Sequence, residues 1–196
     1  MLNFRQHPPR ALLRDDSGTA IIEFAYGLPL ALMLLFGTIV FGDAIVLQRK
    51  VTNATRALAD LTAQGESLAS PGFTTVTLTS NVFQGAQLIL SPYDITKSTL
   101  TISDYCEDST GKITVMWSEY YVPGGTPTAK PVTSPVAPAI STNILPTPTS
   151  GTACITRSDV KYSYTPYIGN SWIAPFTIQD HIYMGARNAP DIPFTP

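Results

Sequence analysis

The feature that most constrains this sequence is an apolar run near its start, which extends from Phe24 to Gly42 without a charged residue. Residues 19–22 extend it toward the N-terminus. Because a helix rises about 1.5 Å per residue, this run is long enough to cross a hydrocarbon core of roughly 30 Å. A cleavable secretory signal has a shorter apolar core, of about 7–15 residues. We therefore expect a membrane-spanning helix, in which Pro29 predicts a kink or local unwinding.

One ionisable residue, Glu23, lies at the beginning of this run. A charged side chain in the middle of a bilayer costs about 2.5–3.5 kcal/mol, less near an end, and is by default a hypothesis of function. The simpler alternative is that Glu23 reaches the headgroups and favours the positive end of the helix.

The residues around Glu23 form a recognisable pattern. Gly18 is followed by four residues and then by Glu23 and Phe24, ahead of the apolar helix. This pattern resembles the processing site of type IV pilin-like proteins, and most closely the TadE/TadG-like pseudopilins of tight-adherence (Tad, Flp) pilus systems. The resemblance implies that a prepilin peptidase cuts the Gly18–Thr19 bond, which makes Thr19 the new N-terminus and Glu23 the fifth residue of the mature chain. The likeness continues to Ala57, and a weaker one covers residues 160–187.

The expected organisation is a leader over residues 1–18, a transmembrane and amphipathic helix over 19–65, and an extracytoplasmic β-rich domain over 66–196. The fold class is α+β and pilin-like, with a long N-terminal helix before a small antiparallel domain. Beyond Gly42 the apolar residues recur at alternating spacings of four and three, which places them on one helix face. This face is either a core stripe against the protein's own sheet or a seam between helices of a filament, and we favour the core. Its members are Val40, Ala44, Leu47, Val51, Ala54, Leu58 and Leu61.

After Gly65, which is expected to end the helix, the pattern indicates short strands. Alternation of apolar and polar residues predicts strands, and the turn with Gly111 predicts a hairpin. Residues 81–91 are left open between a helix and a strand. Seven prolines in residues 123–151 exclude a central strand and predict an extended loop. The predicted strands are 74–79, the hairpin pair 99–106 and 112–121, the returning strand 154–164 and the last strand 172–186.

The two cysteines, Cys106 and Cys154, are far apart and belong to no metal-binding pattern. In an oxidising compartment they would most simply form one disulfide, which closes a loop of about 50 residues and stabilises by roughly 2–4 kcal/mol. The alternative is two buried free thiols. The acidic cluster of Asp104, Glu107 and Asp108 suggests either a solvated turn, which we favour, or a calcium site that lacks the regular loop pattern.

The remaining residues argue against catalysis. His181 is the sole histidine of the expected outer domain, which excludes a multi-histidine metal site there, and zinc spacing, GxSxG, HExxH, P-loop and GxGxxG motifs are missing. A triad of Ser, Asp and His181 assembled in space is the remaining catalytic alternative, but we expect His181 to be an ordinary strand residue. The net charge of −2 and the lack of a basic patch argue against nucleic-acid binding. We expect no enzyme activity, no metal and no cofactor.

We therefore expect a minor pseudopilin that acts in the assembly, priming or capping of a Tad pilus for surface adhesion. Its partners would be the prepilin peptidase, the lipid bilayer, and other pilins and inner-membrane assembly proteins bound through the helix. Basic residues are equally frequent on both sides of the span, so charge leaves the topology open; the resemblance implies a cytoplasmic leader and a periplasmic domain, with possible incorporation into the pilus at the cell surface. The alternative is an uncleaved, membrane-anchored binding or adhesion module that would use the tyrosines at 120, 121, 162, 164 and 167.

Overall fold

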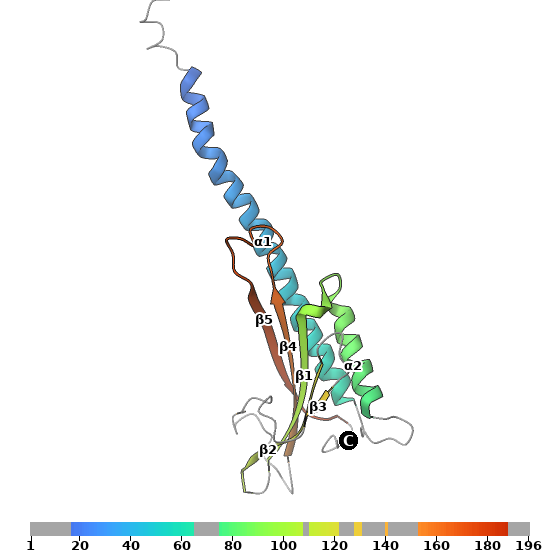
Figure 1. Ribbon diagram of the computed structural model, residues 1–196. Helices are drawn as coiled ribbons and strands as arrows, with labels where there is room; N and C mark the ends of the chain where they lie inside the picture. The colour runs from blue at the N-terminus through green and yellow to red at the C-terminus, as the bar shows by residue number, and fades with distance from the viewer. Residues whose placement is uncertain are drawn as a thin grey trace, which may run out of the picture. The chain divides into compact units, whose positions relative to one another are not determined.

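The computed structural model describes residues 17–64, 75–107, 110–121, 128–130, 140 and 153–187. They belong to two compact units, the first ending at Gly42 and the second beginning at Asp43. The chain is α+β: a long N-terminal helix, α1, precedes a second helix, α2, and a small antiparallel sheet (Figure 1). The expected fold class is therefore confirmed.

Helix α1 extends over Ser17–Ala63 and passes through Pro29 without interruption. A bend at Pro29 stays a prediction, whereas the helix is not unwound there. Within the apolar part, the Thr38 hydroxyl donates a hydrogen bond to the Leu35 carbonyl at 2.8 Å, so this polar group is satisfied inside the helix itself. At the other end, the backbone N–H of Arg187 donates to the Ala63 carbonyl at 3.0 Å, which satisfies one of the otherwise unpaired carbonyls of the last turn. Gly65 lies outside the described residues.

Helix α2, Thr75–Leu90, corrects one prediction and decides another. Residues 74–79 alternate like a strand, but the structure places residues 75–79 in the helix, so the prediction of a strand is wrong. Residues 81–91, for which the sequence allows either a helix or a strand, are helical up to Leu90. The reason is packing: the buried residues of α2 follow helical spacing, and burial of such a face outweighs the weak strand preference of threonine and valine. These buried apolar residues are Val82, Phe83, Ala86 and Leu90.

The sheet has five antiparallel strands in the order β3-β2-β1-β4-β5. A short 3₁₀ turn, η2 (Ile95–Lys97), leads into its central strand, and the Asp94 side chain caps that turn by accepting from the Thr96 N–H at 2.9 Å. The strands are β1 Ser98–Glu107, β2 Ile113–Tyr121, β3 Thr128–Lys130, β4 Ala153–Tyr164 and β5 Phe176–Met184.

The predicted hairpin is confirmed, because β1 and β2 pair directly and Gly111 has the positive φ of 80° that its turn requires. The returning strand is confirmed as β4, and the last strand is shorter than predicted. The proline-rich segment holds the three-residue strand β3 at the sheet edge, a position that proline-rich sequence tolerates. Most of the remainder of that segment lies outside the described residues.

The core lies between one face of the sheet and two helical segments: the part of α1 after Gly42, and α2. Its buried members come from all three, so the apolar face predicted for α1 is a core stripe. Two members of the predicted face are exceptions: Leu61 has 39% of its surface exposed, and Val40 is buried but does not belong to this core. A smaller buried cluster of Tyr105 and Ile155 lies apart from this core. The larger core contains Leu47, Val51, Ala54, Leu58, Phe83, Leu90, Leu100, Ile102, Trp117, Val160 and Tyr162, among others.

Candidate functional site

The residues of the predicted processing site lie on the first turns of α1. Gly18, Thr19, Glu23 and Phe24 are all helical, and the side chains of the last three are exposed. Thr19 and Glu23 are four positions apart and therefore share one face of the helix. An amine created at Thr19 would thus lie within one turn of a carboxylate.

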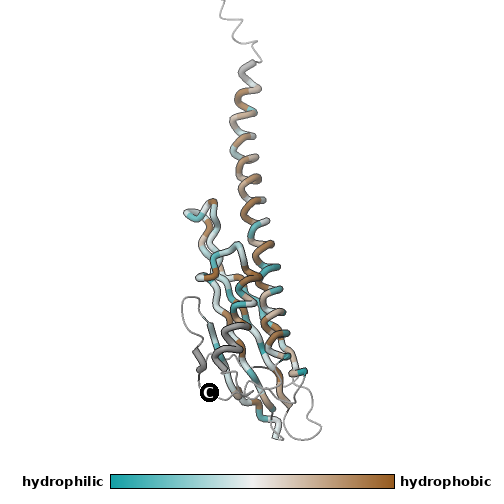
Figure 2. Tube along the Cα trace, turned by 90° about the vertical axis from the view of Figure 1, so that its right-hand side faces the viewer, coloured by the Kyte–Doolittle hydropathy of each residue, from teal (hydrophilic) through white to brown (hydrophobic). Residues whose placement is uncertain are grey.

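The surface that follows is apolar on all sides of the helix. Large hydrophobic side chains from Ile21 to Phe41 are exposed, and only 11% of the most apolar 18 residues is buried. Figure 2 shows mainly hydrophobic residues along this part of α1. A helix that is hydrophobic all round needs apolar surroundings. By length and composition, α1 is able to cross a membrane.

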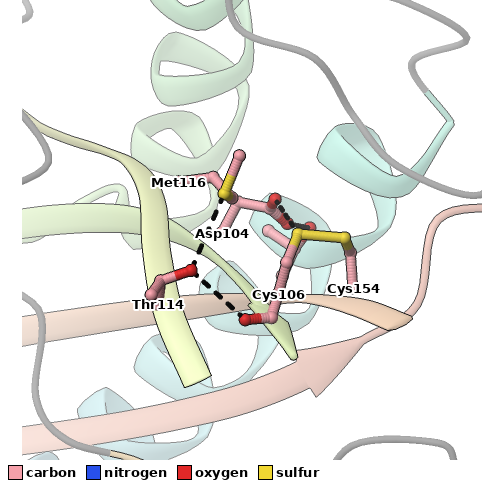
Figure 3. The surroundings of a disulfide bond; sticks show 6 residues. Asp104, Cys106, Thr114, Met116 and Cys154 are labelled. Carbon is pink, nitrogen blue, oxygen red and sulfur yellow. Dashed lines mark hydrogen bonds between the residues drawn. A yellow bond between two sulfur atoms is a disulfide. The ribbon is translucent and has the colours of Figure 1, made fainter. Parts of the chain in front are cut away.

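The predicted disulfide is present between Cys106 and Cys154 (Figure 3). The two residues are direct partners in the register of β1 and β4, so the bridge joins the central strand β1 to its neighbour β4. The Thr114 hydroxyl on β2 donates to the Cys106 carbonyl at 3.5 Å. Both cysteines are therefore committed to structure.

Asp104 is buried beside this bridge rather than exposed in a turn. Its Oδ1 accepts from the Thr156 hydroxyl at 3.1 Å, and its Oδ2 lies 3.6 Å from the Cys106 sulfur. The interpretation of a solvated turn is wrong for Asp104, because β1 extends through it. Asp104 and the two cysteine sulfurs are close enough to suggest metal ligands, but sulfurs joined in a disulfide carry no thiolate for a metal. Asp108, the third member of the acidic cluster, lies outside the described residues.

A group that sequence reasoning missed surrounds Asp43, the first charged residue after the apolar run. The Tyr93 hydroxyl donates to Asp43 Oδ1 at 2.6 Å, and the Tyr164 hydroxyl donates to Oδ2 at 2.8 Å. These three residues, the Asp43 cluster, tie the connection between α2 and β1 and the end of β4 to one point on α1. Burial and the hydrogen bond to Asp43 raise the pKa of Tyr164 to about 12, and the same two causes raise the pKa of Tyr93. Both phenols therefore stay protonated donors at neutral pH.

A second link joins α1 to the end of α2. The Lys50 ammonium donates to the carbonyls of Ile89 and Ser91. These carbonyls belong to the last turn of α2 and the residue after it, where a cation is favoured by the negative end of the helix dipole. Together with the Asp43 cluster, Lys50 holds the α2–β1 connection against α1.

A polar network ties β4 to β5. Arg157 binds Asp159 through two hydrogen bonds of 2.8 and 2.9 Å, and a third guanidinium N–H donates to the Tyr183 hydroxyl at 3.0 Å. Burial alone would lower the pKa of Arg157, but the contact with Asp159 outweighs it and raises that pKa. His181 lies nearby on β5, exposed, with its ring 5.6 Å from that of Tyr183.

The tyrosines of the alternative binding surface divide into two groups. Tyr162 and Tyr164 are buried, and Tyr121 is partly buried and stacks on Phe83 with 5.6 Å between ring centroids. Tyr120 is also partly buried. Tyr167 differs, because 96% of its surface is exposed. Most of these aromatics therefore support the fold instead of forming a shared binding surface.

A comparison with known protein families finds a similarity within helix α1. Residues 18–60 match the family model described as TadE-like protein. We call residues 18–60, which are similar to this family, the TadE-like segment. No curated protein and no solved structure gives a significant match to the chain.

The TadE-like segment begins at Gly18 and includes Glu23, the apolar surface, Asp43 and most of the core stripe. It ends before α2 and the sheet, so the weaker C-terminal resemblance is not part of this match. The resemblance expected from Gly18, Glu23 and the helix is thereby confirmed. Cleavage after Gly18 stays a prediction.

Proposed function

We propose that this chain is a minor pseudopilin of a Tad-type pilus system, inserted in the inner membrane through α1 and cut by a prepilin peptidase between Gly18 and Thr19. The leader would lie in the cytoplasm and the sheet domain in the periplasm, where Cys106 and Cys154 can oxidise. Its role would be structural, in the assembly, priming or capping of the pilus, with no catalytic activity.

One observation carries this proposal: the TadE-like segment starts at Gly18 and continues directly into a helix that is apolar on all sides. Such a surface is satisfied by lipid before assembly and by other apolar helices after it. The partners would therefore be other pilins, pseudopilins and inner-membrane assembly proteins that contact α1 between Thr19 and Gly42.

Glu23 has a specific part in this proposal. A carboxylate on an apolar helix surface costs free energy unless it is paired. Cleavage would create an ammonium group at Thr19, and in an assembly this group on one subunit would pair with Glu23 of a neighbouring subunit. Processing would thus supply the counter-charge that lets Glu23 enter a packed helix bundle.

The proposal is tested by intact mass and N-terminal sequencing after expression with and without a cognate prepilin peptidase. We expect a chain that begins at Thr19 only when the peptidase is present, and no cleavage in Gly18→Val. Thr38→Val serves as the matched control within the same helix and should be cut normally. A wild-type chain that keeps residues 1–18 beside an active peptidase would refute processing and favour the uncleaved, anchored binding module.

The role of Glu23 requires a separate experiment in piliated cells. Glu23→Ala should leave membrane insertion and processing intact but abolish recovery of the protein from sheared pili. Glu23→Gln tests charge at constant shape and should behave like Glu23→Ala. Asp60→Ala, which removes an exposed carboxylate from the same helix, should assemble normally. Normal piliation in Glu23→Ala would exclude the pairing role.

A further inference from the structure

We propose that the loop between β4 and β5, residues 165–175 (the aromatic loop), is a membrane-interface anchor that inserts into the headgroup region of the bilayer spanned by α1. This contact does not depend on cleavage at Gly18, and it concerns the domain before any pilus is assembled.

The aromatic loop exposes large apolar and aromatic side chains, whose contact with water is unfavourable. Trp172 is 91% exposed and Tyr167 is 96% exposed, and Ile173 and Phe176 beside them are also exposed. Residues 165–175 contain no charged residue and no histidine. An uncharged surface with Trp and Tyr is typical of the interface between lipid and water, where the rings contact acyl chains and their N–H or O–H groups stay hydrated.

The loop has a defined conformation that presents these side chains. Gly169 has a φ of 79°, which favours glycine, and its carbonyl accepts hydrogen bonds from the N–H groups of both Trp172 and Ile173 at 2.8 Å. At the base, the rings of Tyr164 and Phe176 lie 5.1 Å apart and close the ends of the two strands. Trp172 is therefore held at a turn whose base is closed by an aromatic contact.

The Asp43 cluster joins the base of this loop to the residue that directly follows the apolar run. Gly42 is the last residue of the uncharged run, and Asp43 follows it directly. Tyr164, the last residue of β4, binds the Asp43 carboxylate at 2.8 Å. The aromatic loop begins at the next residue. If the apolar run is embedded in lipid up to Gly42, Asp43 lies at the membrane surface, and the base of the loop is hydrogen-bonded to it.

The bilayer is the occupant that these observations favour over a second protein. With the apolar run in lipid, the domain that begins at Asp43 starts beside the bilayer, whereas no charged side chain of the loop offers charge complementarity to a protein partner. Amphipathic aromatic side chains match the chemistry of the interface without any further partner.

The experiment uses the full, uncleaved chain reconstituted in vesicles of phosphatidylcholine and phosphatidylglycerol, without peptidase. The chain has two tryptophans, and Trp117 is buried in the core, so the difference between wild type and Trp172→Phe isolates the emission of Trp172. We expect lipids brominated near the headgroup to remove most of this difference signal, and iodide in the water to leave it largely unchanged. The remaining Trp117 emission of Trp172→Phe is the internal control and should respond to neither quencher.

Two results would overturn the proposal. If iodide quenches the difference signal and brominated lipid does not, the loop faces water. If neither quenches it and its emission is shifted to shorter wavelength, the loop contacts protein, such as a second copy of this chain. Near-ultraviolet circular dichroism of Trp172→Phe verifies the fold, and the lack of peptidase keeps this outcome separate from the test of cleavage.

Discussion

Replacement of Asp43 by alanine is expected to lower the free energy of unfolding by about 3 kcal/mol. A hydrogen bond to a charged group contributes about 1.5–3 kcal/mol, and the structure shows two, from Tyr93 at 2.6 Å and from Tyr164 at 2.8 Å. If the two hydrogen bonds contribute independently, the loss of both costs about 3–6 kcal/mol. Asp43 is only partly buried, so water replaces part of what is lost and the lower end applies.

The assay is urea unfolding in detergent micelles, followed by the emission of Trp117, which is buried in the core. The measurements use a Trp172→Phe background, so that Trp117 is the only tryptophan. For a slope of about 1–3 kcal/mol per molar urea, the midpoint should fall by roughly 1–3 M. The matched control is Asp60→Ala, which breaks an exposed ion pair with Arg187 and should cost at most about 1 kcal/mol.

A double-mutant cycle separates the hydrogen bonds from other effects of the substitution. Tyr164→Phe should cost free energy in the wild-type background and almost none once Asp43 is alanine, because its acceptor is already gone. Equal losses for Tyr164→Phe in both backgrounds, or equal losses for Asp43→Ala and Asp60→Ala, would refute the reasoning.

Three further predictions use the same unfolding assay. Reduction of the Cys106–Cys154 disulfide should lower the free energy of unfolding by about 2–4 kcal/mol. In the double variant Cys106→Ser and Cys154→Ser, reductant should leave the free energy of unfolding unchanged. Burial and its carboxylate partner raise the pKa of Tyr164 from 10.0 to about 12, so its contribution is complete below pH 10 and is lost as the pH rises toward 12; Tyr164→Phe should flatten this decline. Phe83→Ala should cost about 3–5 kcal/mol because Phe83 is fully buried, whereas Leu88→Ala on the same helix should cost under about 0.5 kcal/mol because that side chain is 77% exposed; similar losses would contradict the assigned core.

The sequence predicts those parts of the fold in which neighbouring residues determine the outcome. The apolar run, the face that continues from Leu47 to Leu58 and the hairpin around Gly111 all depend on local spacing. Helix α2 does not depend on local spacing alone. Residues 75–79 have the composition of a strand, but they are helical because they continue into a helix whose buried face includes Phe83. Tertiary packing decides such segments, and its effect is invisible in a short window of sequence.

The candidate sites divide in the same way. Gly18 and Glu23 are recognisable because their spacing is short and the helix follows at once. The Asp43 cluster joins residues 43, 93 and 164, and nothing in the sequence relates them before the strands are paired. The only available signal was that Asp43 is the first charged residue after the apolar run. For the aromatic loop, the sequence pattern predicts Trp172 within the last strand, whereas β5 begins only at Phe176.

The disulfide between β1 and β4 also divides the chain into a closed ring and the parts outside it. Strands β2 and β3 lie in the ring between Cys106 and Cys154, whereas α1, α2 and β5 lie outside. A chain cut anywhere between the two cysteines would therefore remain one covalent molecule until it is reduced. Its helix α1 would stay joined to β4 and β5, so a cut in the proline-rich segment cannot by itself release the C-terminal strands from α1.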